Sequence, residues 1–230
     1  MDDTFAIDAL ARCPLFEQAD RGILRSLAAG LRRRRFRRNE VIFHQGDPGD
    51  SLHVVASGAV KIVLPSTEGE EAIIATLRPG DFFGELALLD GASRSATAAA
   101  IEPSETMVLP RAVFVDLLDT LPGLRDALLA GLAYELRRLT GHVEELHFLD
   151  LAGRLAMRLT RLAREESPDA HGRIRLDWPF TQSDLAAMIG GTRQSVNRLL
   201  SGLILEGLIS IGPDGLVITD LDELARRAER

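Results

Sequence analysis

Residues 79–100 read PGDFFGELALLDGASRSATAAA, and this stretch says more about the fold than any other part of the chain. Gly84 permits a tight turn, and the residues after it are typical of one short helical turn whose free N–H groups face an anion. Glu85 is an acceptor suited to a ribose hydroxyl. Arg94 and Ser95 suit one phosphate diester. The stretch therefore predicts a nucleotide pocket; the alternative is a surface turn with an incidental acid and base.

Length and composition limit the class of protein. The 230 residues are 46% hydrophobic with a formal net charge of −7, which predicts one large or two smaller domains with a real core. The apolar runs are too short to span a bilayer, and the N-terminus carries acids where a signal peptide carries Lys or Arg. Cys13 is the single cysteine, so no internal disulfide or all-cysteine metal site can form. We expect a soluble cytoplasmic protein without metal, covalent cofactor or membrane partner.

Between residues 41 and 109 the chain consists of short apolar runs separated by turn residues. Many short strands with frequent turns predict a sandwich or double-sheet roll. The predicted strands are Val41–His44, Leu52–Ala56, Ala59–Leu64, Ala72–Leu77, Thr97–Ile101 and Thr106–Leu109. The arginine-rich run 32–38 is interpreted as a solvated edge that leads into the first strand; the alternative is contact with the flanks of bent DNA.

Helical periodicity precedes and follows the strands. A short helical entry is expected before residue 32. After Pro110, six apolar residues are spaced 3, 4, 3, 4, 3, which predicts a heptad seam and therefore a partner helix. They are Leu129, Leu132, Leu136, Leu139, Val143 and Leu146. The alternative is a helix packed on its own domain. A new amphipathic helix is expected over 151–163, followed by a loop over 165–172.

The stretch TQSDLAAMIGGTRQSVNRLLSGL, residues 181–203, has the pattern of a helix-turn-helix. Thr181 can cap the first helix with Asp184 at the capping-box position, and Thr192 can cap the second. In the second helix, apolar residues bury one face while four polar ones project from the other. The projecting residues are Arg193, Gln194, Asn197 and Arg198, whose types reach base edges in DNA. Two short strands, 208–211 and 216–219, predict a wing.

The cassette of residues 79–96 resembles the phosphate-binding segment of the cyclic-nucleotide-binding β-rolls. The helix-turn-helix narrows the resemblance to the bacterial regulators typified by the cAMP receptor protein and the fumarate-nitrate reductase regulator. The likeness runs from about Phe16 to about Asp220. It implies an α+β chain in three domains: a cyclic-nucleotide-binding double-stranded β-roll, or jelly roll (1–121), a dimerisation helix and hinge (122–150), and a winged helix-turn-helix (151–230).

By this resemblance, Glu85 binds the ribose 2′-hydroxyl while Arg94 and Ser95 hold a cyclic phosphate. The backbone near Gly84 assists them. The remaining ligand-binding residues that the resemblance implies are Leu86, Ala87, Ile62, Ile74, Leu139 and Thr140. In the family, hydroxyl residues of the long helix meet the base, and here Leu139 replaces one of them. The expected effector is cAMP; the alternatives are cGMP, cyclic di-GMP, or a regulator of the same fold that needs no ligand.

The resemblance also implies a homodimer that binds a two-fold palindromic operator, with half-sites about one helical turn apart. RNA polymerase is an expected partner, and a hinge is expected near Asp150. The family's recognition helix begins Arg-Glu-Thr, whereas this one begins with residues 193–195, Arg-Gln-Ser. Gln is better matched to adenine than to cytosine, so the inner base of the half-site is open. The full set expected at DNA is Thr181, Gln182, Thr192, Arg193, Gln194, Ser195, Asn197 and Arg198.

Two other classes of function fit the sequence less well. An enzyme is disfavoured, with no catalytic residues assigned, because the sequence has no Walker loop, metal-ligand cluster or paired acid and base beside the pocket. A cyclic-nucleotide sensor that does not bind DNA would share the roll, but it needs no recognition helix. Arg193 and Arg198 separate this alternative from a DNA-binding regulator.

Overall fold

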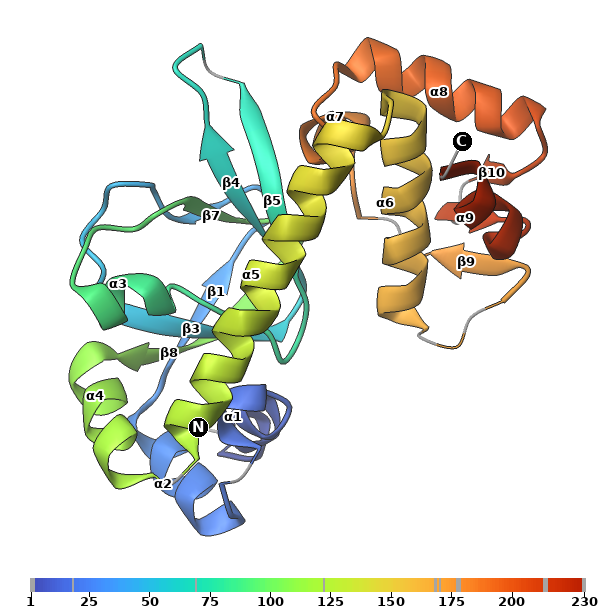
Figure 1. Cartoon of the computed structure of the whole chain (residues 1–230). Coiled ribbons are helices and arrows are strands. Elements are labelled where there is room, and N and C mark those ends of the chain that lie inside the picture. The colour runs from blue at the N-terminus through green and yellow to red at the C-terminus, as the bar shows by residue number, and fades with distance from the viewer. Residues whose placement is uncertain are drawn as a thin grey trace. The chain divides into compact units, whose positions relative to one another are not determined.

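The computed structural model describes residues 3–17, 19–68, 70–121, 123–167, 169, 171–176, 179–212 and 215–228. Its contacts divide the chain into two compact units, Met1–Arg137 and Arg138–Arg230, which are described one at a time (Figure 1). Several predicted turn and loop residues, namely Gly69, Pro168, Ala170, Pro213 and Asp214, lie outside the described residues. Among the helices that are described, none is long and apolar enough to cross a membrane.

The first unit is built on two antiparallel four-stranded sheets, which confirms the predicted double-stranded β-roll. The first sheet has the order β1-β8-β3-β6 and the second β2-β7-β4-β5. The strands are β1 (Arg32–Phe36), β2 (Val41–Phe43), β3 (Ser51–Ser57), β4 (Val60–Pro65), β5 (Glu71–Leu77), β6 (Phe82–Phe83), β7 (Thr97–Ala100) and β8 (Ser104–Pro110). Apolar side chains of both sheets share one buried cluster, so the core lies between the two layers.

Helices cover the outer face of the first sheet (Figure 1). A second core joins apolar residues of β3 and β8 to these helices, which explains why β3 is buried on both faces. The helices of this unit are α1 (Asp3–Ala11), the 3₁₀ turn η1 (Pro14–Phe16), α2 (Arg21–Gly30), α3 (Glu85–Asp90), α4 (Arg111–Thr120) and the first half of α5 (Leu124–Phe148).

The arginine-rich run is a largely exposed sheet edge, as predicted, but its place in the strand order differs from the prediction. It does not lead into the first strand but forms it, because β1 pairs along its whole length with β8 at the edge of the first sheet. Arg35 lies opposite Glu105 in the register, and both Arg33 and Arg35 make ion pairs with that carboxylate. One acid on the neighbouring strand thus offsets part of the positive charge along this exposed edge.

The second unit holds the end of α5 and the predicted winged helix-turn-helix. Asp150 caps the first helix after α5 by accepting from the Gly153 N–H at 2.7 Å, so the break expected near 149–151 is present. The elements are α6 (Leu151–Glu166), β9 (Ile174–Leu176), α7 (Gln182–Ile189), α8 (Arg193–Leu205), β10 (Ile209–Gly212), β11 (Gly215–Ile218) and α9 (Leu221–Ala228). α6 is longer than predicted, and β9 joins the hairpin as an unpredicted third strand in the order β10-β11-β9.

Candidate functional site

Gly84 brings the two halves of the predicted cassette together. It has a φ of +85°, and a Cβ placed on it would lie 2.5 Å from Nη1 of Arg94. Any side chain here would be strained by the backbone and would displace the guanidinium. The α3 helix begins at the next residue, Glu85. The acid and the base of the cassette, nine residues apart in sequence, therefore lie on either side of this glycine.

Arg94 is buried, with 4% of its surface exposed. Its Nη1 donates to the carbonyl of Gly84 at 2.7 Å, and its Nη2 donates to the carbonyl and hydroxyl of Ser51 at 2.8 and 3.2 Å. Its Nε is buried without a hydrogen-bond partner among the described residues. Ser51 was not predicted, because its role depends on a partner 43 residues away; its only local sign is its place after a turn at the start of β3.

An aromatic cluster lies behind Arg94. The Cζ of Arg94 is 4.2 Å from the ring centroid of Phe43, which in turn contacts His53 and Phe83 at 5.9 and 5.8 Å. His53 stacks on Phe83 at 5.0 Å, and its Nδ1 lies 3.1 Å from the hydroxyl oxygen of Thr106. Burial, together with the nearby positive charge of Arg94, lowers the pKa of His53 to about 3, so its ring is neutral.

Two carboxylates influence the acidic side of the cassette. The pKa of Glu85 is raised, first by burial and then by the negative charge of Glu135 on α5, while Arg94 acts in the opposite direction. The pKa of Arg94 is lowered by burial, against the attraction of Asp50, Glu85 and Asp47. The site therefore holds a half-buried acid and a buried base, and burial shifts the pKa of both. Such groups are typical of positions that bind a charged or polar ligand.

The other predicted ligand residues vary in exposure. Ser95 and Leu86 are exposed, and Ile62 and Ile74 are half-buried on β4 and β5. Ala87 is buried beneath Gly49, where a Cβ would lie 2.1 Å from the Cβ of Ala87. The glycine thus lets the turn before β3 close over α3.

Leu139 and Thr140, the two predicted ligand residues on α5, belong to the second unit and are exposed there. Leu139 is a member of the predicted heptad seam, most of which is also exposed. Leu136 and Val143 are 67% and 62% exposed, and Leu129 and Leu146 are exposed as well. Leu132 differs, because it is half-buried against the core of the first unit. An exposed apolar row of this length on one helix is typical of a surface that another helix covers.

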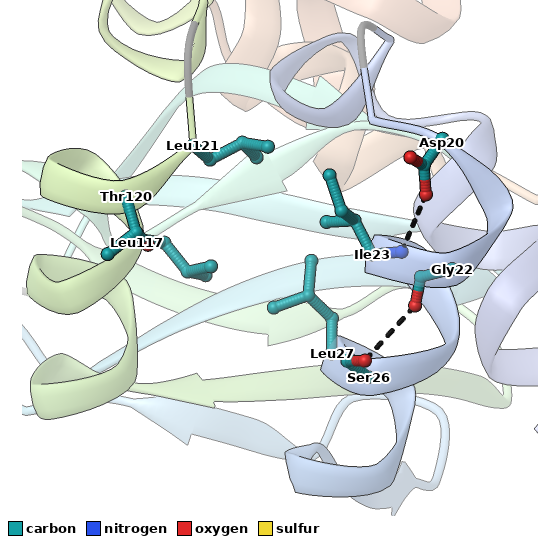
Figure 2. Close-up of a pocket in the computed structure, with 8 residues that line it drawn as sticks. All are labelled: Asp20, Gly22, Ile23, Ser26, Leu27, Leu117, Thr120 and Leu121. Carbon is teal, nitrogen blue, oxygen red and sulfur yellow. Dashed lines mark hydrogen bonds between the residues drawn. The ribbon is translucent and has the colours of Figure 1, made fainter.

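A separate groove of about 420 Å³ lies between α2 and α4 (Figure 2). Ile23 and Leu27 face Leu117 and Leu121 across it, and Asp20 at its rim caps α2 by accepting from the N–H of Ile23 at 2.9 Å. None of its lining residues belongs to the predicted ligand set. In the part of the chain that the structure describes, no cluster of three or more His, Cys, Asp or Glu side chains could hold a metal ion.

The helix-turn-helix is fixed by its caps. The hydroxyl of Thr181 accepts from the Asp184 N–H at 3.1 Å, and the carboxylate of Asp184 accepts from the Thr181 N–H at 2.9 Å, which completes the predicted capping box. Gly190 ends α7 with a φ of +68°. Thr192 then caps α8 by accepting from the Ser195 N–H at 3.1 Å. Both predicted N-caps of the helix-turn-helix, Thr181 and Thr192, are therefore present.

The two faces of α8 differ as predicted. Val196, Leu200 and Leu203 are buried, and Leu199 is half-buried. The exposed residues of the helix include all four candidates for base contact, namely Arg193, Gln194, Asn197 and Arg198. The other residues expected at DNA, Thr181, Gln182, Thr192 and Ser195, lie at the first turns of α7 and α8, where backbone N–H groups suit phosphate contacts.

Comparisons with known proteins find matches for both parts of the chain. Residues 33–120 match the family model of the cyclic nucleotide-binding domain, and residues 153–227 match that of the Crp-like helix-turn-helix domain. A CRP-like cAMP-activated global transcriptional regulator of Mycobacterium tuberculosis is 31% identical over 221 residues, which cover 96% of this chain and 99% of the relative. A cyclic AMP receptor protein of Thermus thermophilus is 34% identical over 85% of this chain and 88% of its own length. The structure of FixK2 from Bradyrhizobium japonicum has a TM-score of 0.76 at 25% identity, covering 85% of this chain and 96% of that one.

Proposed function

The chain belongs to the CRP family of cyclic-nucleotide-responsive, DNA-binding transcription regulators, and on that premise we propose that its effector is cAMP and that it acts as a homodimer. The observation that carries the proposal is that Gly84 lies between a buried Arg94, whose Nη1 it approaches, and a half-buried Glu85, the next residue in the chain. The guanidinium suits the cyclic phosphate and the carboxylate suits the ribose 2′-hydroxyl. Ser95 and the backbone near Gly84 complete the phosphate contacts, and Ile62 and Ile74 line the base.

Calorimetry with cAMP, cGMP and cyclic di-GMP tests the choice of effector. The wild-type protein binds cAMP most tightly, Arg94→Ala loses that binding, and Arg32→Ala keeps it, since Arg32 is an exposed arginine of the same domain. Tighter binding of cGMP or cyclic di-GMP would contradict the choice of cAMP while leaving the phosphate site in place. Equal binding by Arg94→Ala would contradict the site itself.

The exposed heptad row of α5 supports the homodimer. Covering large apolar side chains such as Leu136 and Val143 with a second copy of the same helix removes them from water on both chains. Sedimentation of Val143→Glu tests this, with Tyr134→Glu as the control. Tyr134 is 63% exposed, much like Val143, but lies off the seam. The proposal expects monomers for the first variant and dimers for the second; dimers of Val143→Glu would contradict it.

For DNA, we propose that α8 enters the major groove of each half of a palindromic operator. Arg193 contacts a guanine, and Gln194 favours adenine where the family's acid accepts from cytosine. Phosphate contacts come from the first turns of α7 and α8. Selection of binding sites from random DNA tests this, because it returns the half-site directly. The family's usual half-site, returned unchanged, would contradict the role given to Gln194.

The proposed division of labour assigns residues 1–121 to the effector, 122–150 to dimerisation and the hinge, and 151–230 to DNA. The effector favours one arrangement of the dimer, and a change near Asp150 alters the position of the recognition helices. RNA polymerase is the proposed partner at promoters, and the chain itself leaves the bound nucleotide chemically unchanged. Operator affinity measured at one salt concentration with and without cAMP tests the coupling; equal affinities would contradict it.

A further inference from the structure

The guanidinium of Arg94 is held along its edge and across its face by different parts of the chain. Along the edge, three acceptors of Gly84 and Ser51 bind Nη1 and Nη2. On another side, Cζ lies over the ring of Phe43, 4.2 Å from the ring centroid. Acceptors along an edge fix where the nitrogen atoms lie, whereas a ring on the face fixes the plane of the group. Both are needed to orient a planar cation.

The ring of Phe43 is itself held in place. Phe43 lies at the end of β2 in the second sheet, whereas His53 and Phe83 lie on β3 and β6 of the first sheet. The three rings meet at 5.0 to 5.9 Å, and the Thr106 hydroxyl fixes His53 from the neighbouring strand β8. The cluster therefore spans both layers of the roll, and Phe43 is its member that touches Arg94.

We propose that Phe43 is a positioning residue for the ligand: its ring, braced by His53 and Phe83, holds the Arg94 guanidinium in the plane that a cyclic phosphate requires. The role rests on the proposed function of Arg94. A hydrocarbon face takes up no N–H group, so it orients the cation without competing with the phosphate for its donors. The buried Nε–H, which has no partner among the described residues, is one donor that this arrangement leaves for an anion.

The simpler interpretation is that Phe43 only fills the core between the sheets. Phe36 provides a matched control, because it is a buried aromatic residue of the same apolar cluster. Its ring lies 5.2 Å from the Cζ of Arg34, and no contact of that ring with Arg94 is seen among the described residues. Phe36→Leu and Phe43→Leu remove the same atoms from the same core. Only Phe43→Leu takes the ring from Arg94.

The first measurement is cAMP affinity by calorimetry for Phe43→Leu, Phe43→Tyr and Phe36→Leu, with urea unfolding to verify that each variant is folded. Phe43→Leu is expected to weaken binding about tenfold, because the guanidinium must then be ordered when the ligand binds. Phe43→Tyr retains the aromatic face and is expected to stay within about threefold of wild type, as is Phe36→Leu. Wild-type affinity for Phe43→Leu, or an equal loss for Phe36→Leu, would overturn the proposal.

The second measurement does not need a ligand. The side-chain ¹⁵Nε–¹Hε signal of Arg94, assigned by its loss in Arg94→Lys, reports the ring beside it through the ring-current shift. In Phe43→Leu this shift is expected to disappear, and in Phe36→Leu and Phe43→Tyr to persist. An unchanged signal in Phe43→Leu would overturn the proposal. Failure of the wild-type protein to bind any cyclic nucleotide would count against the proposed function, and the positioning role would then be decided by this signal.

Discussion

Arg94 is expected to bind the phosphate of a small ligand, and Arg193 is expected to bind a base of DNA. The first side chain is buried, whereas the second is exposed. Arg94 lies inside the β-roll with its edges on Gly84 and Ser51 and its face on Phe43. Arg193 lies exposed at the first turn of α8. A small ligand supplies few contacts, so its site must be oriented beforehand. A DNA duplex supplies a long surface, so a helix can present flexible side chains to it from outside.

The difference has consequences for stability. A buried cation and a half-buried carboxylate must be stabilised by the fold around them, and the pKa values of Glu85, Arg94 and His53 are all shifted by burial. The exposed side chains of α8 bear little on the core. Changes in the ligand site should therefore alter both binding and folding, whereas changes on α8 should alter binding alone.

The largest expected effect concerns His53. Its pKa is lowered to about 3 in the folded protein, so as the pH falls from about 6.5 only the unfolded chain takes up the proton. The free energy of unfolding should drop by about 3 kcal/mol between pH 7 and pH 4 from this residue alone. Urea unfolding at the two pH values measures the drop. His53→Gln should remove most of it, because the amide does not titrate and can still bond to Thr106.

His44→Gln is the control for that experiment, since His44 is exposed at the end of β2. It should leave the acid sensitivity of the wild-type protein in place. If both variants lose stability on acidification as steeply as the wild type, His53 does not carry the effect, and the contrast between a buried ligand site and an exposed reading helix is weakened.

The second prediction compares the replacement of each arginine by alanine. Arg94→Ala should lower cAMP affinity by about 100-fold, or about 2.7 kcal/mol, because the ligand loses a charged donor. It should also destabilise the free protein by about 1–3 kcal/mol, since the carbonyls of Gly84 and Ser51 lose their partner in a buried place. Calorimetry and urea unfolding measure the two losses.

Arg193→Ala should show the reverse pattern. Operator affinity should fall by about 1–3 kcal/mol, while cAMP affinity stays the same and the free energy of unfolding changes by no more than about 0.5 kcal/mol. Fluorescence anisotropy with an operator duplex measures the first quantity. A clear loss of stability in Arg193→Ala would show that α8 is not the independent reading surface described above.

A third prediction sharpens the description of the reading helix. Gln194→Glu restores the acid found at this position in the family, and it should shift the preferred base pair toward cytosine by about 1–3 kcal/mol. Binding to two operators that differ at this one position measures the shift. Because Gln194 is exposed on α8, unfolding and cAMP binding should remain as in the wild type. An unchanged base preference would mean that Gln194 does not reach the base.

The smallest effect is a gain. The pKa of Glu85 is raised in the folded protein by burial and by the charge of Glu135. Ionisation of this carboxyl therefore lowers the free energy of unfolding at pH values above the pKa of the unfolded carboxyl, near 4.3. Glu85→Gln should therefore stabilise the ligand-free protein at pH 7 by on the order of 1 kcal/mol, and the gain should shrink toward pH 4. Thermal unfolding at both pH values measures it. Asp90→Asn, at the exposed end of α3, should show no such gain.

Much of the reading helix could be predicted from the sequence because its signals are local. Thr181 and Thr192 cap residues three positions away, and the buried and exposed faces of α8 follow from helical spacing. The cassette was also visible, since Gly84, Glu85 and Arg94 lie within eleven residues. Local signals were therefore enough to predict the class of the two sites, the order of the nucleotide-binding and helix-turn-helix domains, and most strands of the roll.

The residues that support the ligand site could not be predicted, because they come together only when the strands pair. Ser51 and Phe43 reach Arg94 from 43 and 51 positions away, and Glu135 approaches the charge of Glu85 from another helix. Strand order and register set these meetings, and no short spacing encodes them. The same reason applies to β1, because the arginine-rich run forms a strand by pairing with β8, whose Glu105 makes ion pairs with it. The faces of a helix follow from residues three or four positions apart in the sequence. Burial and charge at the ligand site depend instead on which distant strands pair.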